Sequence, residues 1–408
     1  MRILHVDKFL RRQGGAASYM LDLGRTQVGH GHEVEYFAMA HPDNEPATYE
    51  ALFPPFIAFD EAPSGVVGAI TMTHTMVHSR RARDAMRTVV ERFRPDVVHL
   101  HNIYHQLSPS ILQPLRRAGI PAVMTVHDFK LVCPTYRMLD RNGPCDACVR
   151  KGFREAVIRR CNRGSLAASA LVAVESSLHR MLGSYGHVSK FLAPSQFLAD
   201  LLKRADVYPE RVQVLPHGFG VDPKARPGGR DGSVVFVGRL SPEKGVDTAI
   251  RAIGMASTPS AHLHVLGSGP EERALRALAA TEAPGRVTFH GHVGREAVLE
   301  RLRTSSVAVL TARYYENQPM SILEAFACGV PVVGTDLGGI PELVDETTGR
   351  LVPPEDPVRV AVVLDALLQS PIVAERLGRN AQDRVATRHD PAVHLGALDD
   401  VYAKVTKP

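Results

Sequence analysis

The segments Val307-Ala-Val-Leu-Thr311, Glu316-Asn-Gln-Pro-Met-Ser-Ile-Leu-Glu324 and Ala325-Phe-Ala-Cys-Gly329 follow one another in the chain and decide its fold. The first is a short apolar run, which predicts a buried strand, and the other two lead into a predicted helix. Pro319 suits the first helical position because its missing N–H costs nothing there, and Gly329 suits the position just after the last turn. The stretch is therefore a strand–loop–helix unit with one carboxylate in the loop and a second in the helix.

The start of this helix is suited to bind an anion. The amides of Met320, Ser321 and Ile322 have no partner within the helix, so they would point from the end of a strand at a phosphate. Glu316 lies ahead of that position and Glu324 lies inside the helix, and carboxylates accept hydrogen bonds from sugar hydroxyls. The pattern predicts a ligand with central phosphates and a sugar at each end, which describes a nucleotide-sugar. The alternative is a surface helix whose glutamates only cap or pair.

Short apolar runs alternate with amphipathic helical stretches along the rest of the chain, which predicts parallel sheets with helices on both faces. The expected strands fall into two sets. The first set is Ile3–Val6, Val34–Ala38, Val97–Leu100, Ala122–Val126 and Phe191–Pro194. The second set is Val234–Val237, Leu263–Leu266, Val287–Phe289, Val307–Leu310 and Val332–Val333. The sequence thus predicts an α/β protein with two Rossmann-like, doubly wound domains.

The length of 408 residues also favours two domains over a single core. Between the two sets of strands lies Asp222-Pro-Lys-Ala-Arg-Pro-Gly-Gly-Arg-Asp-Gly232, which has the Pro and Gly density of a connector. We expect one domain over residues 1–210, a second over 211–389 and a closing segment over 390–408. Ligands of open α/β sheets bind beyond the carboxyl ends of the strands, so two facing sheets would form a cleft.

Two further strand ends in the second half carry residues suited to phosphate. Gly238-Arg239 follows one strand and Lys244-Gly245 precedes the next helix. A guanidinium fork and an ammonium could together neutralise a diphosphate, above all one that is leaving. Surface salt bridges are the alternative. Gly267 and Gly269 form a turn after another strand, where a backbone without side chains can approach a nucleotide closely.

In the first half, Gly14 and Gly15 follow the first strand and open a helix. A dinucleotide fingerprint would need a longer glycine pattern, so a plain helix-start turn is the alternative. His127-Asp128 follows the fourth strand and places an imidazole and a carboxylate where a sugar hydroxyl or a proton could be met. His99 and His101 lie on another strand and suit packed, hydrogen-bonded positions.

Four cysteines lie within one insertion, residues 133–161, and they are Cys133, Cys145, Cys148 and Cys161. A C-x-x-C pair flanked by two more thiols is typical of a structural zinc site, which would staple a long loop that lacks its own core. The outer spacings are not those of a familiar ribbon or finger, so free or partly buried cysteines are the alternative. Disulfides are disfavoured in the reducing cytoplasm.

Composition and charge indicate an ordinary globular protein, with a net charge of +5. The chain opens directly into its first strand and no apolar run approaches the ~18 residues that span a bilayer, so we expect a cytoplasmic protein. Nucleic acid is not expected as a partner, because the charge is modest and no aromatic platform accompanies it.

One segment, Ser79–Arg94, is strongly basic and reads as a helix. It could dock on anionic lipid at the inner face of a membrane or on an anionic acceptor. A solvated helix face is the alternative. The arginines of this segment are Arg80, Arg81, Arg83, Arg87, Arg92 and Arg94.

Taken together, these residues resemble the retaining glycosyltransferases of glycosyltransferase family 4, whose GT-B fold sets two Rossmann-like domains across a cleft. The likeness covers nearly the whole chain, and it rests on the order and spacing of motifs that are each weak alone. The motifs are Gly14-Gly15, His127-Asp128-Phe129, Leu215-Pro-His-Gly218, Gly238-Arg239-Leu240 with Lys244-Gly245, Gly267-Ser-Gly269-Pro270, the pair Glu316 and Glu324, Gly329-Val-Pro-Val-Val333 and Gly338-Gly339.

The resemblance implies transfer of a sugar from a UDP- or GDP-sugar to a hydroxyl of a carbohydrate, lipid-linked or small-molecule acceptor, with retention and without a required metal. Polysaccharide, glycolipid or glycoconjugate biosynthesis is the expected setting. The first domain would face the acceptor, and residues 390–408 would return to it as a helix. The implied roles are diphosphate binding for Arg239 and Lys244, donor-sugar contact for Glu316, ribose contact for Glu324, phosphate contact for the amides after Pro319, a place beside the reacting sugar for His127, and approach to phosphates or acceptor for Gly15.

Asn317 and Gln318 depart from the family pattern, which often has Gly-Phe before the proline. They would put two amide side chains beside the donor sugar, so we expect donor choice to depend on them. Two alternatives remain for the function. One is a GT-B enzyme of another type, an epimerase or a phosphorylase, although no pyridoxal-phosphate lysine motif is visible. The other is a nucleotide-binding module without transferase activity, which would need a dinucleotide fingerprint that neither half supplies.

Overall fold

The computed structural model describes residues 1–12, 14–57, 75–220 and 230–407. Gln13 and most of the expected connector, residues 222–229, lie outside the described residues. The chain forms two compact units, one of Met1–Leu215 with His394–Pro408 and one of Pro216–Val393. The expected boundaries were placed at residues 210 and 389, a few residues before those of the structure.

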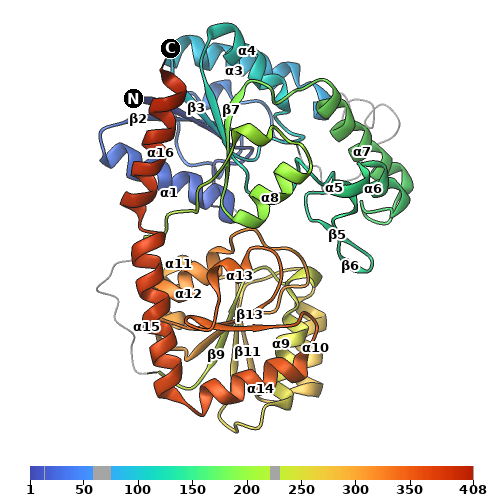
Figure 1. The fold of residues 1–408 in the computed structure, drawn as a ribbon, viewed down its shortest axis with the longest axis vertical. Coiled ribbons are helices and arrows are strands. Elements are labelled where there is room, and N and C mark those ends of the chain that lie inside the picture. Colours follow the sequence, from blue (N-terminus) through green and yellow to red (C-terminus); the bar gives the residue numbers. More distant parts are fainter. Residues whose placement is uncertain (13, 58–74, 221–229, 408) are drawn as a thin grey trace. The chain divides into compact units, whose positions relative to one another are not determined.

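Unit 1 is built on a six-stranded parallel sheet in the order β2-β1-β3-β4-β7-β8. The strands are β1 (Arg2–Val6), β2 (Glu33–Phe37), β3 (Val97–Leu100), β4 (Ala122–Thr125), β7 (Val188–Ala193) and β8 (Val212–Val214). The main helices are α1 (Gly15–Gly29), α3 (Arg80–Phe93), α4 (Leu112–Ala118), α7 (Leu166–Met181) and α8 (Gln196–Arg204). Residues of the central strands β3 and β4 are fully buried, as expected of a sheet covered by helices on both faces (Figure 1).

Unit 2 repeats the architecture with a six-stranded parallel sheet in the order β11-β10-β9-β12-β13-β14. The strands are β9 (Val234–Val237), β10 (Leu263–Leu266), β11 (Val287–Gly291), β12 (Val307–Leu310), β13 (Val332–Thr335) and β14 (Gly349–Val352). The helices are α9 (Val246–Met255), α10 (Glu272–Glu282), α11 (Arg295–Thr304), α12 (Met320–Ala327), α13 (Ile340–Leu343), α14 (Pro357–Leu368) and α15 (Pro371–Arg388). Strand order reverses between β9 and β12, which makes the carboxyl ends of these two strands the topological switch point.

The predicted fold class, two Rossmann-like parallel-sheet domains, is confirmed, and every predicted strand is present. Besides the short hairpin strands of the cysteine insertion, two strands of the large sheets, β8 and β14, were not predicted. Both lie at the edge of a sheet and are only partly buried, so their sequences need no long apolar run. Pro319 is the residue before α12, with an extended ψ of 117°, and not its first helical residue. Gly329, in the left-handed region at φ 68°, follows the helix as predicted.

The last helix, α16 (Pro391–Thr406), belongs to unit 1 from His394 onward. Its Leu395, Leu398, Val401 and Tyr402 are buried in one cluster with apolar residues of the first sheet and of α1. Among these are Ile3, Tyr19, Leu23, Val97, Val123 and Leu192. The segment that follows unit 2 thus completes the core of unit 1.

Between β4 and α7 lies the cysteine insertion, with a short antiparallel hairpin of β5 (Leu139–Asp140) and β6 (Gly143–Pro144) and two short helices, α5 (Ala147–Lys151) and α6 (Arg154–Ile158). Lys130 anchors its start, because the buried ammonium donates to Glu175 of α7 at 2.7 Å and to the Pro134 carbonyl at 3.0 Å.

Among the described residues, no single helix combines the length and the apolar composition needed to cross a bilayer. Taken as a pair, α14 and the α15–α16 segment pass that test on length and composition alone, with a bend of 98° between them.

Candidate active site

At the switch point of unit 2, the loop after β9 and the loop after β12 bring a lysine and a glutamate together. Lys244 Nζ donates to Glu316 Oε1 at 2.6 Å and to the Tyr314 hydroxyl at 2.9 Å. Glu316 is 8% exposed, so the carboxylate is held in a largely dry setting. The two residues to which the sequence assigned diphosphate and sugar contacts are therefore direct neighbours.

The ion pair fixes the charge of Lys244. Burial lowers the pKa of this ammonium, but the charge of Glu316 and the interactions with Glu316 and Tyr314 together outweigh burial, so the pKa lies above its ordinary value. Burial and the Glu316 charge raise the pKa of Tyr314, which keeps this phenol neutral. An ammonium has three N–H donors, and two of them are used, so one remains for an anionic ligand.

Glycine turns hold the backbone of this pair. Gly338 has a φ of 61°, and a Cβ there would lie 2.4 Å from the Glu316 carbonyl oxygen, which also accepts the Gly339 N–H at 2.8 Å. On the other side, a Cβ on Gly245, at φ 65°, would lie 1.9 Å from the Thr311 carbonyl oxygen. Only glycine fits at these two contacts, so the loops after β9, β12 and β13 are locked to one another.

The first turn of α12 follows Glu316 and presents two backbone donors. The amides of Met320 and Ser321 donate to no acceptor among the residues that the structure describes. The third predicted donor differs, since the Ile322 amide donates to the Pro319 carbonyl at 3.1 Å and closes a tight turn. The helix start therefore offers two free amides to a ligand.

Glu324 lies inside α12 as an ionisable group with no partner. It is partly buried, and within the described ranges its carboxyl accepts no hydrogen bond. Burial raises its pKa to about 7, and the nearby charge of Arg295 opposes that shift. A carboxyl that loses water without gaining donors is suited to bind hydroxyls of a ligand.

Arg239 and the glycines around it occupy the neighbouring loops. The Arg239 side chain is exposed and pairs with none of the described residues, which leaves the guanidinium available to an anion. A Cβ on Gly267 would lie 1.9 Å from the Gly238 carbonyl oxygen, and one on Gly269 would lie 2.2 Å from that of Leu240. The close approach that these glycines allow is between the loops after β9 and β10.

The two amides that precede Pro319 have different surroundings. Asn317 is buried, at 7% exposure. Gln318 accepts the His217 amide N–H at 2.7 Å through its Oε1, and so links the loop after β12 to the start of unit 2. The His217 carbonyl in turn lies 3.0 Å from His389 Nδ1. Gln318 Nε2 also lies 3.3 Å from His389 Nδ1, so both ends of the Gln318 amide already have partners within unit 2.

In unit 1, polar residues gather at the carboxyl ends of β1, β3 and β4. Gly14, at φ 82°, precedes α1, and Gly15 is its first residue. His127 and Asp128 follow β4, and Asp7 follows β1. Burial raises the pKa of Asp7 to about 6 and also raises that of Asp128, and the nearby Asp128 charge contributes to the shift of Asp7.

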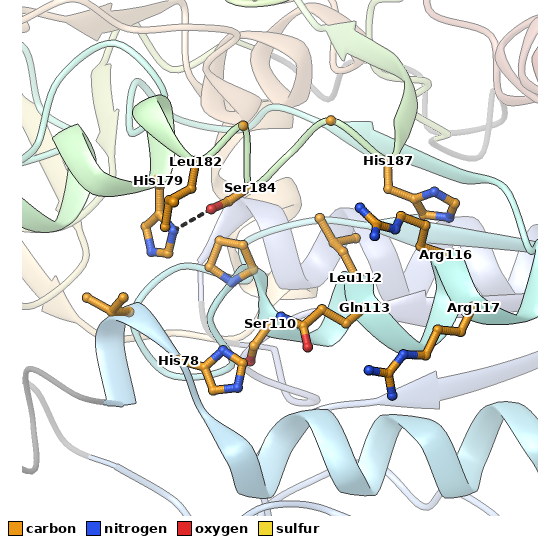
Figure 2. A pocket seen from close by; sticks show the side chains of 14 residues that line it. His78, Ser110, Leu112, Gln113, Arg116, Arg117, His179, Leu182, Ser184 and His187 are labelled. Atoms are coloured by element: carbon orange, nitrogen blue, oxygen red, sulfur yellow. Dashed lines mark hydrogen bonds between the residues drawn. The ribbon is translucent and has the colours of Figure 1, made fainter.

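A pocket of unit 1 has a volume of about 650 Å³ and is lined by none of the predicted site residues. Figure 2 shows His78, Arg116, Arg117, His179 and His187 around it, with His179 Nδ1 and Ser184 Oγ hydrogen-bonded at 2.9 Å. It is lined by α4, the end of α7 and the loop before β7. Its cationic lining is separate from the residues at the strand ends.

Sequence reasoning missed three polar groups that the fold brings to the predicted residues. Tyr314 bonds Lys244, Arg295 lies near Glu324, and Asp7 lies near Asp128. Tyr314 and Asp7 each follow a predicted strand, so the rule applied to His127 would have found them. Arg295 begins α11, and its nearness to Glu324 depends on helix packing that no local pattern reveals.

Two family models match the chain. Residues 13–223, more than half of it, match Glycosyltransferase Family 4, and residues 222–384 match Glycosyl transferases group 1. Together they cover both units.

Individual relatives agree with the family assignment. A GDP-mannose-dependent monoacylated alpha-(1-6)-phosphatidylinositol monomannoside mannosyltransferase of Corynebacterium glutamicum is 35% identical over 148 residues, which are 34% of this chain and 39% of that protein. The alpha-D-kanosaminyltransferase of Streptomyces kanamyceticus is 29% identical over 306 residues, which are 71% of this chain and 72% of that one. The match spans only about two fifths of the mannosyltransferase but most of the kanosaminyltransferase.

Among solved structures, the Anabaena protein HepE, in complex with UDP-glucose, superposes with a TM-score of 0.67 at 18% identity, over 99% of this chain and 100% of that one. That likeness shows the shared architecture, which other glycosyltransferases of the GT-B fold also have. The chain belongs to glycosyltransferase family 4, and it is a glycosyltransferase with the GT-B fold.

Proposed function

We propose that this enzyme moves a sugar, with retention at the anomeric carbon, from a nucleoside diphosphate sugar to a hydroxyl acceptor. One observation carries the proposal: the switch point of unit 2 joins the Lys244–Glu316 pair to a helix start with two free amides and to the unpartnered Glu324. Cationic and amide donors suit the diphosphate, and carboxylates on either side suit the hydroxyls of the sugar and the ribose.

The proposed roles follow from position. Lys244 and Arg239 neutralise the diphosphate, and the amides of Met320 and Ser321 bind a phosphate oxygen. Glu316 accepts from donor-sugar hydroxyls and Glu324 from the ribose, while unit 1 contributes His127 beside the sugar and Gly15 beside a phosphate or the acceptor. Asn317 remains the candidate for donor choice, and Gln318 contributes by holding the loop that carries Asn317, because its Oε1 is bonded to His217 and its Nε2 to His389.

In the proposed front-face step, the bond between the anomeric carbon and the diphosphate oxygen breaks as the acceptor oxygen bonds to that carbon on the same face. The acceptor proton passes to the departing diphosphate. Lys244 and Arg239 stabilise the negative charge that develops on that leaving group. Since two cationic side chains serve this purpose, we propose that transfer needs no metal ion at the active site, and turnover should not depend on added divalent metal ions.

Two similar proteins support a nucleotide-sugar donor here. HepE was solved with UDP-glucose, and the Corynebacterium mannosyltransferase is GDP-mannose-dependent. We therefore propose a UDP- or GDP-sugar donor, and a carbohydrate, lipid-linked or small-molecule acceptor in polysaccharide, glycolipid or glycoconjugate biosynthesis. The proposed location is cytoplasmic, either free or bound peripherally at the inner face of the membrane through α3.

A thermal-shift screen of UDP- and GDP-sugars tests donor binding, because a ligand that binds only the folded state raises its melting temperature. The bound donor then serves in turnover assays of Lys244→Ala and Glu324→Gln. We expect each variant to lose at least about 10²-fold in kcat/KM, which corresponds to about 2.7 kcal/mol of transition-state stabilisation. Arg273→Ala, an exposed arginine on α10, is the control. Near-wild-type turnover of both site variants would refute the assignment.

A further inference from the structure

The four cysteines of the insertion gather around one point of unit 1. All are free, Cys133 and Cys148 are buried, and Cys145 and Cys161 are partly buried. Burial raises the pKa of the Cys148 thiol, and the nearby charges of Cys133, Cys161 and Cys145 raise it further. Residues spread over 29 positions of sequence are thus within electrostatic reach of one thiol.

The backbone around them is arranged as it is around metal-binding thiolates. The β5–β6 hairpin ends at Cys145, whose amide donates to the Met138 carbonyl at 2.7 Å. The Ala147 amide lies near the Cys145 sulfur, and the Ala156 amide lies near the Cys148 sulfur. Nearby N–H groups favour the thiolate form, the form that binds metal.

The insertion has little else to hold it. Its own buried cluster consists of Cys148, Phe153, Ala156 and Ala173, with Val157 and Cys161 packed against it. A core of this size does not stabilise two short helices and a two-residue hairpin without a covalent or metal cross-link. We propose that Cys133, Cys145, Cys148 and Cys161 bind one structural zinc ion, which would cross-link the hairpin and the two helices that this small cluster holds.

Within the described ranges, the one set of three ligand atoms closer than 4.8 Å to each other is in His5, His99 and His101. Both ring nitrogens of each of these residues are already hydrogen-bonded, so they hold no lone pair for an ion. The thiols stand further apart, and zinc would draw the sulfurs to about 3.8 Å from one another, the edge of a tetrahedron with bonds of about 2.3 Å.

Metal analysis tests the site without any assay of turnover. Protein purified without chelator should contain about one zinc per chain. Cys145→Ser, at a partly exposed position, should lose most of that zinc, whereas Cys328→Ser, a buried cysteine of unit 2, should keep it. Cobalt exchanged into the wild-type protein should show thiolate-to-cobalt charge-transfer absorption. Hydrogen exchange should accelerate in residues 133–161 on chelation. Metal-free protein with an equally protected insertion, or disulfides among these cysteines by mass spectrometry, would overturn the proposal.

A separate observation concerns a buried chain of imidazoles that ends at His127. The Gln27 Oε1 lies 2.7 Å from His5 Nε2, His5 Nδ1 lies 3.0 Å from His101 Nε2, and His101 Nδ1 lies 2.9 Å from His127 Nε2. Burial lowers the pKa of His5 to about 4 and that of His127 to about 3, so both rings are neutral at pH 7. Each of the two carries one proton.

The amide oxygen at the start of this chain sets its direction. An amide oxygen only accepts, so His5 carries its proton on Nε2 and accepts from His101 through Nδ1. His101 must then carry its proton on Nε2, and its Nδ1 accepts from His127 Nε2–H. His127 therefore carries its proton on Nε2 and none on Nδ1.

We infer that Gln27 is a positioning residue, which fixes His127 as the tautomer protonated on Nε2. The expected effect on turnover rests on the proposed function, but the tautomer does not. Gln27 Nε2 also donates to the Tyr402 hydroxyl at 3.3 Å, which holds the amide in this orientation.

Nitrogen-15 NMR of histidine-labelled protein reads the tautomer directly. Wild type should show His127 protonated on Nε2. Gln27→Glu should retain that state, because its carboxylate still accepts a hydrogen bond from His5. Gln27→Leu should give a mixture of the two tautomers and reduce kcat/KM by about tenfold, or 1.4 kcal/mol. Gln196→Leu, on an exposed helix face, is the control. An Nδ1-protonated His127 in wild type, or an unchanged tautomer in Gln27→Leu, would overturn the inference. A changed tautomer with unchanged turnover would instead count against the proposed role of His127.

Discussion

At the scale of single residues, the partly buried carboxyl of Glu324 lowers the stability of the folded protein when it is ionised. Its pKa is raised to about 7 from an ordinary value of 4.5, so between these two pH values the folded protein keeps a proton that the unfolded chain releases. Stability therefore falls as pH rises through this window, and the loss is complete above it. The residue proposed for ribose binding therefore lowers the free energy of unfolding of the protein without ligand.

We predict that Glu324→Gln removes this cost. Relative to wild type, the variant should gain about 2 kcal/mol in the free energy of unfolding at pH 8 and show little difference at pH 4, where both side chains are neutral. Urea unfolding at the two pH values measures this. Glu346→Gln, an exposed glutamate of the same unit, is the control. A gain of equal size at both pH values would contradict the titration argument.

Much of the candidate site follows from one rule about residues, namely that ligands bind where strands end. His127, Arg239, Lys244, Glu316 and Glu324 were chosen by that rule. The side-chain contacts of these residues were not predictable from the sequence. The Lys244–Glu316 bond, for example, joins residues 72 positions apart and depends on the order of strands in the sheet. The hydrogen bond between His217 and Gln318 likewise joins residues 101 positions apart.

At the scale of elements, the turn after β13 controls the loop that carries Glu316. We predict that Gly338→Ala destabilises unit 2 by ~2 kcal/mol or more, because φ is 61° and the added Cβ would lie 2.4 Å from the Glu316 carbonyl oxygen. The same variant should reduce turnover by displacing Glu316.

The control for this prediction is Gly294→Ala, since a Cβ at Gly294 meets no heavy atom within 4 Å. Its effect should stay within about 0.5 kcal/mol. Thermal unfolding and donor turnover are measured for both variants. Equal effects of the two substitutions would show that the contact with Glu316 does not matter.

The basic helix α3 also belongs to this scale. Ala82, Met86, Val89, Val90 and Phe93 form its buried face, while Arg80, Arg81 and Arg87 are exposed. Arg83 differs, because it bonds Asp84 at 2.9 Å and His78 at 3.1 Å. The helix is therefore amphipathic, with a cationic outer face, as the sequence predicted.

If α3 docks on membrane, changing Arg80, Arg81 and Arg87 to Gln should weaken binding to phosphatidylserine vesicles by at least about tenfold, since each cation near an anionic surface contributes about 1 kcal/mol. Vesicle flotation at 0.1 M salt measures this. Changing Arg376, Arg379 and Arg388 of α15, also exposed, removes the same charge elsewhere. Equal losses from both triple variants would indicate a general charge effect, and no binding by wild type would remove the membrane from the proposal.

The sequence predicted buried strands better than edge strands or the cysteine insertion. Buried strands such as β3 and β12 carry unbroken apolar runs, so pattern alone located them. The edge strands β8 and β14 have partly buried residues and depend on a neighbouring strand for their hydrogen bonds, which a local pattern does not contain. The insertion lacks both kinds of periodicity, and only its cysteines marked it.

At the scale of the whole molecule, α16 ties the chain's closing segment to its first sheet. Leu398 is fully buried in the cluster that includes Ile3 and Val123. We predict that Leu398→Ala lowers the stability of unit 1 by about 2–5 kcal/mol through the cavity it leaves. Hydrogen exchange should accelerate within residues 1–215 and stay unchanged in residues 216–393.

Leu364→Ala provides the reciprocal control, because Leu364 is fully buried in the core of unit 2. It should accelerate exchange in residues 230–393 and leave the first sheet unchanged. Acceleration of both units by either substitution would contradict the division of the cores. Sequence patterns located both sheets, but the membership of α16 in the first core came only from the resemblance, because an apolar helix face does not state which sheet it will cover.

The same helix sets an order of events during synthesis. All of unit 2 leaves the ribosome before residues 394–406 do, so the second unit can fold while the first still lacks Leu398 and Tyr402. The usual sequence, in which the N-terminal domain folds first, is thereby reversed for its final step. The first sheet stays partly uncovered until α16 has been synthesised. A product that stalls or ends before α16 would expose this apolar surface to chaperones that bind such surfaces.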